Sequence, residues 1–139
     1  MYRLMDSRGF TLIEILIVVI IIGMLGALVG PNVYNRYEKA KWNNTKNQIN
    51  MLDSALDDFR LDNGRYPTTE EGLESLMKAV EDLPKWSGPY LKKAVPNDEW
   101  GRPFVYQCPG EHGEYDLYSY GKDGTEGGEK NDKDVVNWE

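Results

Sequence analysis

Residues 10–29 read FTLIEILIVVIIIGMLGALV and hold a single charged side chain, Glu14. At about 1.5 Å of rise per residue, a helix of this length spans roughly 30 Å, the thickness of the hydrocarbon layer of a bilayer. An ordinary secretory signal has a shorter apolar region and a small-residue cleavage site, and residues 30–34, GPNVY, provide no such site. A single-pass anchor fits the length. It leaves Glu14 to be explained, either by a position at the membrane surface or by a partner, because a carboxylate in the membrane costs a few kcal/mol.

The remainder of the chain is polar and acidic. The net charge over 139 residues is −7, and an acidic protein lacks the Lys/Arg surface that displaces counterions from nucleic acid. We therefore expect no nucleic-acid partner. The acidity is compatible with a soluble head or with binding of a hard cation. The single cysteine, Cys108, excludes a disulfide within the chain, and the length leaves room for one small domain.

Helical periodicity continues beyond the apolar run. Apolar residues recur there at spacings of three and four, which is typical of an amphipathic helix packed on a core: Ile49, Leu52, Ala55, Leu56 and Phe59. Asn63-Gly64 is a stop signal. We therefore predict a helix from roughly Phe10 to Asn63, interrupted or kinked at Gly30-Pro31. Residues 10–30 form its transmembrane and assembly half, which must lie in lipid or against other copies, and residues 31–64 form its amphipathic half.

Residues 65–139 are predicted to form a small head that covers this stripe. Thr68 or Thr69 suits the N-cap of a short helix that ends before Pro84. The apolar face of that helix would consist of Leu73, Leu76, Met77 and Val80. Two aromatic runs, residues 104–107 and 115–120, predict short strands joined through residues 108–114. The expected fold class is α+β, with a long helix packed against a short helix and a small antiparallel sheet.

A specific signal precedes the apolar run. Residues 8–14, RGFTLIE, follow a short leader that contains Arg3, and this stretch resembles the processing motif of type IV pilins and pseudopilins. The resemblance implies a leader of residues 1–9, cleavage between Gly9 and Phe10 by a prepilin peptidase, and N-methylation of Phe10. It also implies that Glu14 pairs with the amine of Phe10 in a neighbouring subunit, each buried charge serving the other. Arg3 and Arg8 would hold the leader in the cytoplasm.

Four sequence blocks in the head limit the resemblance to one family within the pilin-like group. They are residues 66–73 (YPTTEEGL), 88–91 (GPYL), 98–104 (DEWGRPF) and 116–128 (DLYSYGKDGTEGG). They resemble the major pseudopilin, or G subunit, of type II secretion systems, although Glu99 stands where that family usually has proline. The resemblance implies a structural subunit without enzymatic activity, anchored once in the inner membrane with its head in the periplasm of a Gram-negative bacterium. Such subunits polymerise into a pseudopilus that drives export of folded proteins across the outer membrane. The implied partners are further copies of the chain, minor pseudopilins, the inner-membrane assembly platform and the prepilin peptidase.

Residues 121–134, GKDGTEGGEKNDKD, are rich in carboxylates and glycine. Their composition alone fits a solvated acidic loop, and no EF-hand spacing is present. The family resemblance instead implies a calcium site in this loop, which would hold the loop on the sheet in a head without a disulfide. Lys130 stands where the family leads us to expect another acidic residue. The implied ligands of Ca²⁺ are the side chains of Asp123, Asp132 and Asp134 and the backbone carbonyls of Leu117, Tyr120 and Gly128.

Two other functions compete with this interpretation. A type IV pilin of a surface pilus shares the N-terminal motif, but such pilins commonly carry a cysteine pair that this chain lacks. A membrane-anchored enzyme would use Cys108 and His112 as a nucleophile and its base. Pro109 beside the cysteine and the lack of a second histidine argue against that enzyme. His112 is expected to be an exposed loop residue.

Overall fold

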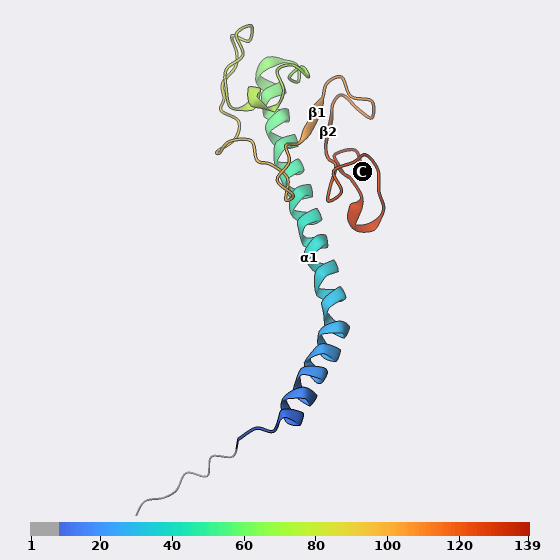
Figure 1. The fold of residues 1–139 in the computed structure, drawn as a ribbon. Helices are drawn as coiled ribbons and strands as arrows, with labels where there is room; N and C mark the ends of the chain where they lie inside the picture. The colour runs from blue at the N-terminus through green and yellow to red at the C-terminus, as the bar shows by residue number, and fades with distance from the viewer. Residues whose placement is uncertain (1–8) are drawn as a thin grey trace, which may run out of the picture. The chain divides into compact units, whose positions relative to one another are not determined.

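The computed structural model describes residues 9–139 (Figure 1). The predicted leader, with Arg3 and Arg8, lies outside the described residues except for Gly9. In chain order the elements are the helix α1 (Leu12–Asn63), the 3₁₀ turn η1 (Leu73–Leu76), the strands β1 (Val105–Gln107) and β2 (Asp116–Ser119), the 3₁₀ turn η2 (Lys130–Asp132) and the strand β3 (Val135–Val136). This order of a long helix followed by a small sheet confirms the predicted α+β class.

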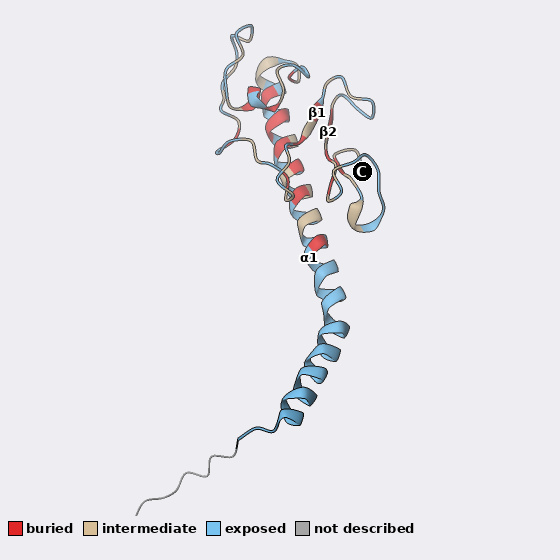
Figure 2. Cartoon of the chain, viewed as in Figure 1, coloured by how far each residue is buried: buried red, intermediate tan, exposed pale blue. Residues whose placement is uncertain are grey.

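The helix α1 is 52 residues long and contains Pro31 in its interior. The sequence predicted an interruption or a kink at this proline. The helical backbone is not interrupted, because the loss of one N–H donor leaves the hydrogen bonds on both sides intact. The chain divides into two compact units, one that ends at Tyr37 and one of residues 38–139. Every residue from Gly9 to Tyr37 is exposed, and Glu38 is the first buried residue (Figure 2).

The predicted apolar stripe of α1 forms the base of the core in the second unit. Its five residues are at most 3% exposed. They pack in one cluster with residues from η1, the following loop and all three strands: Leu73, Leu76, Leu91, Phe104, Tyr106, Leu117 and Val135. Burial of one large apolar side chain contributes about 1.5–3 kcal/mol. The head is therefore held on α1 mainly by this cluster.

The sheet is antiparallel and has the strand order β1-β2-β3. β1 pairs with β2 through Tyr106 and Leu117, and β2 pairs with β3 through Tyr118 and Val136. The two predicted strands are present, each shorter than the aromatic run that predicted it. β3 was not predicted. It brings the end of the acidic loop beside β2.

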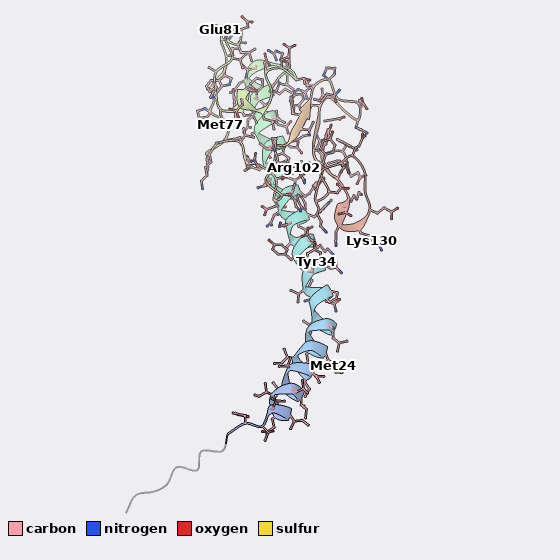
Figure 3. The ribbon with its side chains drawn as sticks, viewed as in Figure 1. Met24, Tyr34, Met77, Glu81, Arg102 and Lys130 are labelled. Carbon is pink, nitrogen blue, oxygen red and sulfur yellow. The ribbon has the colours of Figure 1, made fainter. Side chains whose placement is uncertain are left out.

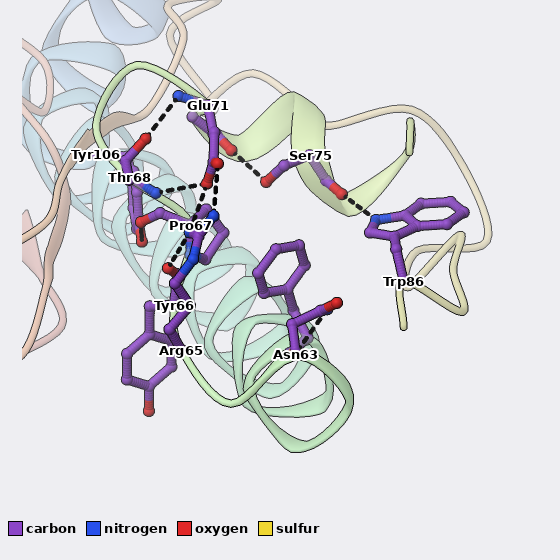
Figure 4. Close-up of polar contacts among 11 residues, drawn as sticks. Asn63, Arg65, Tyr66, Pro67, Thr68, Glu71, Ser75, Trp86 and Tyr106 are labelled. Carbon is purple, nitrogen blue, oxygen red and sulfur yellow. Dashed lines mark hydrogen bonds and ion pairs between the residues drawn. The ribbon is translucent and has the colours of Figure 1, made fainter. Parts of the chain in front are cut away.

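The segment after the long helix contains a single 3₁₀ turn, where the sequence predicted a short α-helix. Thr68 and Glu71 form the reciprocal hydrogen bonds typical of a cap: Thr68 Oγ1 accepts from the N–H of Glu71 (3.2 Å), and Glu71 accepts from the N–H of Thr68 (2.8 Å; Figure 4). The residue that precedes η1 is nevertheless Gly72, which makes no side-chain cap hydrogen bond. Gly72, however, has a φ of 58°, outside the helical region, so a helix cannot run on from this cap. Helical backbone begins only at Leu73, and Met77 packs against the core from beyond the turn.

Residues 133–139 are attached to the second half of α1. The indole N–H of Trp42 donates to the carbonyl of Lys133 (3.2 Å). The ammonium of Lys46 donates to the carbonyls of Val136 and Glu139. These bonds join parts of the chain 90 to 93 positions apart, so they close the head around its helix.

Candidate assembly and calcium sites

Thr11 and Glu14 cap the start of α1. Glu14 Oε2 accepts from the backbone N–H of Thr11 (2.8 Å) and from its hydroxyl (2.9 Å), and Thr11 Oγ1 accepts from the N–H of Glu14 (3.3 Å). This reciprocal arrangement is a capping box, which satisfies N–H groups that the first helical turn leaves unpaired. This role of Glu14 was not predicted from the sequence, although the spacing T-x-x-E is typical of a capping box. Within residues 9–139, no donor to the other oxygen, Oε1, is found.

Among the described residues of its own unit, nothing covers the apolar half of α1. Phe10 is 83% exposed, and Leu12 is 87% exposed. Side chains such as Met24 stand out from the ribbon along this half (Figure 3). By length and composition alone, α1 is the one helix among the described residues that could cross a membrane.

Asp134 has one carboxylate oxygen with a partner and one buried oxygen without. Its Oδ2 accepts from the N–H of Gly127 (2.8 Å), whereas its Oδ1 is buried without a hydrogen-bond partner. Burial raises the pKa of Asp134, and the nearby charges of Asp123 and Glu126 raise it further. The carboxylate of Asp134 is therefore repelled by two neighbouring carboxylates. Glu126 was not among the predicted ligands, and the sequence offered no signal beyond its place in the same acidic stretch.

The other predicted ligands already have partners or tight neighbours. Asp123 accepts from the N–H and the hydroxyl of Thr125 (3.1 and 3.0 Å). The carbonyl of Leu117 accepts from the N–H of Asn137 (3.0 Å). A Cβ added to Gly128 would lie 2.3 Å from the carbonyl oxygen of Asp132, so these two predicted ligands pack backbone to backbone.

The remaining predicted ligand, Tyr120, lies just after β2, with its hydroxyl 3.5 Å from that of Tyr118. Lys130 lies at the start of η2 with a φ of 54° (Figure 3). In the part of the chain that the structure describes, no three His, Cys, Asp or Glu side chains are grouped as a metal site. Asp123 therefore lies close enough to Asp134 for its charge to raise the pKa of that acid. Among the described residues the acids do not form a coordination cage.

The loop nevertheless fits a hard cation in its chemistry. All its candidate donors are carboxylate or carbonyl oxygens, the ligands that Ca²⁺ prefers. A buried polar atom without a partner is costly and uncommon in proteins, and Asp134 Oδ1 is such an atom. A cation would supply its missing partner and offset the repulsion among the neighbouring carboxylates.

Cys108 and His112 do not form a pair. The thiol of Cys108 donates to the carbonyl of Glu114 (3.4 Å), whereas His112 Nδ1 lies 2.9 Å from Asp116 Oδ2. His112 is exposed, as predicted. The carboxylate of Asp116 also accepts from the backbone N–H groups of Glu111 and His112. His112 therefore does not activate Cys108 as a nucleophile.

The profile of the family described as "Type II secretion system (T2SS), protein G" matches residues 32–138, and that of "Prokaryotic N-terminal methylation motif" matches residues 4–30. The first match spans more than half of the chain. The chain belongs to the type II secretion system protein G family. The resemblance drawn from the four blocks and the N-terminal motif is thereby confirmed.

Individual relatives agree with this family. The chain is 47% identical to the type II secretion system core protein G of Pseudomonas aeruginosa over 137 residues, which cover 96% of both proteins. It is also 47% identical to the protein of that name from Escherichia coli K12 over 136 residues, or 95% of this chain and 91% of the relative. Among solved structures, the major pseudopilin from the type 2 secretion system of enterohaemorrhagic Escherichia coli superposes with a TM-score of 0.64 at 35% identity, covering 78% of this chain and 95% of the other.

Membership in this protein G family settles two predictions. The chain is a major pseudopilin, a structural subunit, and the prediction that it is not an enzyme is confirmed by its family. The membrane-anchored enzyme and the surface pilin are therefore set aside. Together with the N-terminal motif, the family associates the chain with the inner membrane and the periplasmic pseudopilus.

Proposed function

We propose that the chain polymerises through its N-terminal helices into a pseudopilus that grows from the inner membrane into the periplasm and drives export of folded proteins across the outer membrane. The observation that carries this proposal is the exposure of every residue of α1 up to Tyr37. An apolar surface of this extent requires lipid or other copies as its surroundings. Minor pseudopilins and the inner-membrane assembly platform would be the further partners.

The proposed subunit has four parts. Residues 1–9 are removed by a prepilin peptidase, which leaves Phe10 as a methylated N-terminus. Residues 10–30 cross the inner membrane once before assembly and form the fibre core afterwards. Residues 31–64 carry the head, residues 65–139, on the periplasmic side. The match of the methylation motif to residues 4–30 supports the processing step.

The assembly contact would join Glu14 of one subunit to the amine of Phe10 in the next. The capping box occupies Glu14 Oε2. A carboxylate has about four acceptor positions on its two oxygens, so capping and pairing are compatible. In hydrocarbon each charge would be neutralised by the other, which removes most of the cost of burying either alone. The pair would also fix the axial register of neighbouring subunits.

Two variants separate these roles of Glu14. Glu14→Gln keeps an oxygen that can accept from Thr11 but removes the charge, so we expect loss of pseudopili and of exoprotein secretion with an unchanged melting temperature of the head. Thr11→Val weakens the cap by about 1 kcal/mol but leaves the carboxylate, so fibres should persist. Electron microscopy of sheared fibres and secretion assays measure both effects. Normal fibres from Glu14→Gln would refute the charge pairing.

We further propose that the acidic loop binds Ca²⁺. Asp123, Asp132 and Asp134 would hold the ion through their side chains, and Leu117, Tyr120 and Gly128 through their carbonyls. The unpartnered Oδ1 of Asp134 supports this assignment. When bound, the ion supplies positive charge to the loop. The chain's own carboxylates then no longer repel one another, and the loop is fixed against the sheet.

Thermal melts of the full-length chain in detergent test the calcium site. All four tryptophans (Trp42, Trp86, Trp100 and Trp138) lie in the unit of residues 38–139, so their fluorescence reports on the head. Calcium at one hundred times its Kd should add about 2.7 kcal/mol, or roughly 10–15 °C for a unit of this size. Asp134→Asn should abolish the gain, whereas Asp82→Asn, at an exposed acid outside the loop, should retain it. If chelation leaves the melting temperature of the wild type unchanged, the calcium proposal is wrong.

A further inference from the structure

A buried polar network joins the turn at residues 98–102 to the start of the acidic loop. Asp98 is only 5% exposed. Its carboxylate accepts from the N–H groups of Trp100 (3.0 Å) and Arg102 (2.8 Å) and from the hydroxyl of Ser119 (2.6 Å). Ser119, 1% exposed, accepts in turn from the N–H of Gly121 (3.0 Å). One carboxylate therefore fixes both the turn and the backbone where the loop begins.

Arg102 adds a second connection to the same backbone (labelled in Figure 3). Its guanidinium donates to the carbonyls of Gly121 (2.6 Å) and Lys122 (3.3 Å). Gly124 packs directly on this group, since a Cβ there would lie 2.7 Å from Arg102 Cζ. Asp123, a predicted calcium ligand, is thus flanked on both sides by residues that contact the guanidinium.

The later part of the loop is held differently. The N–H of Gly127 donates to Asp134, and the N–H of Asp132 donates to the carbonyl of Glu129 (3.0 Å). These bonds stay within the loop, and Asp134 is itself a predicted ligand. The support of the two parts of the loop therefore differs. Asp98, Ser119 and Arg102 fix the backbone beside Asp123, whereas the later part has its own internal bonds and one donor from α1, the indole of Trp42, at the carbonyl of Lys133 (3.2 Å).

We propose that Asp98, Ser119 and Arg102 are positioning residues for the calcium site. They fix the backbone that carries Asp123 before any cation binds, so that binding has less of the loop to order. This inference rests on the calcium proposal above. Groups that orient metal ligands without touching the metal typically contribute 10- to 100-fold to affinity, because a preorganised site loses less conformational freedom on binding.

A calorimetric titration of the full-length chain with Ca²⁺, in detergent, tests the network. Ser119→Ala and Arg102→Met should each raise the Kd for Ca²⁺ by 10- to 100-fold. Arg102→Lys should recover part of the lost calcium affinity, because lysine keeps a positive donor near the two carbonyls. The recovery should be incomplete, because an ammonium lacks the planar fork of the guanidinium. Hydrogen exchange without calcium should show reduced protection at the amide of Gly121 in Ser119→Ala.

Two control substitutions, matched to Ser119→Ala and Arg102→Met, lie in the segment around η1, outside the acidic loop (Figure 4). Ser75 is 3% exposed and donates to the carbonyl of Gly72 (2.6 Å), as a buried counterpart of Ser119. Arg65 donates to the carbonyl of Tyr66 (3.0 Å) and pairs with Glu71, as a counterpart of Arg102. Ser75→Ala and Arg65→Met should lower the melting temperature without changing the Kd.

The outcomes are distinguishable. If Ser119→Ala and Arg102→Met lower the calcium-free melting temperature as the controls do but keep a Kd within twofold of the wild type, the network is only structural and the calcium site stands. If the wild type itself binds no calcium, both proposals are overturned. Should Arg102→Met fail to fold, Ser119→Ala and Arg102→Lys provide the same comparison.

Discussion

Replacement of Asp116 by asparagine should destabilise the head at neutral pH. The side chain is 4% exposed. Its Oδ2 accepts from the N–H of Glu111 (2.9 Å) and lies 2.9 Å from His112 Nδ1, and its Oδ1 accepts from the N–H of His112 (3.1 Å). Asparagine keeps one oxygen and turns an amide NH₂ toward groups that themselves donate. The expected cost is about 2–3 kcal/mol, the value of one or two hydrogen bonds to a charged group.

This cost corresponds to a measurable shift in the melting temperature. The unfolding entropy is about 2.1 cal/mol/K per residue, so for the unit of residues 38–139 each kcal/mol changes the melting temperature by roughly 5 °C. We expect Asp116→Asn to melt about 10–15 °C below the wild type at pH 7. Tryptophan fluorescence of the full-length chain in detergent measures the shift. Asp82→Asn, at an exposed acid, should melt like the wild type.

The difference should disappear in acid. Burial opposes ionisation of Asp116, but the hydrogen bonds from His112 and Glu111 outweigh it and lower the pKa of this carboxyl. An acid with a lowered pKa in the fold stabilises it above its unfolded pKa of about 3.9, and this contribution is lost as the pH falls through the folded value. The gap between wild type and variant should therefore be full at pH 7 and shrink below about pH 4. A gap as large at pH 2.5 as at pH 7 would refute the role assigned to the ionised carboxylate.

Two further changes probe the core and a half-buried acid. Leu56→Ala should lower the free energy of unfolding by about 2–5 kcal/mol, because Leu56 is 0% exposed. Leu61→Ala, at a residue that is 82% exposed, should change it by less than about 0.5 kcal/mol. Urea denaturation measures both changes, and equal losses would contradict the assigned core. Burial raises the pKa of Asp53, although the hydroxyl of Tyr115 donates to it (2.8 Å). Ionisation of Asp53 therefore destabilises the folded head as the pH rises toward its raised pKa. The free energy of unfolding of Asp53→Asn, relative to that of the wild type, should increase with pH above about 4. A decrease would show that ionised Asp53 stabilises the head.

The long helix and its buried stripe could be predicted because periodicity is a property of many residues at once. The strand β3 could not, since Val135 and Val136 are two residues whose strand character comes from pairing with β2. The short helix was overpredicted for a related reason. The cap formed by Thr68 and Glu71 is real, but the positive φ of a single residue, Gly72, prevents the backbone from continuing as a helix after it.

The candidate site was predictable only in part. Asp123 and Asp134 were named from the family resemblance, and no coordination cage forms around them in the described residues. The support of the loop by Asp98 could not be predicted from the sequence. Its partner Ser119 is 21 positions away, and although both residues stand in blocks that carry the family resemblance, neither block indicates that they are in contact. Glu14 shows the opposite case. The capping partner of Glu14 lies three positions away, so the cap could have been predicted from the spacing. Because a charge in an apolar run is unusual, Glu14 was interpreted only as a contact with another subunit.

The attachment of residues 133–139 to Trp42 and Lys46 determines the order in which the head can fold. These contacts close loops of 90 to 93 positions, and such long-range closure is slow because its entropy must be lost before the contacts form. α1 can form from local contacts while the chain is still being made. The native head, by contrast, has to wait until residue 139 is available, so a half-synthesised subunit has a helix but no closed domain around it.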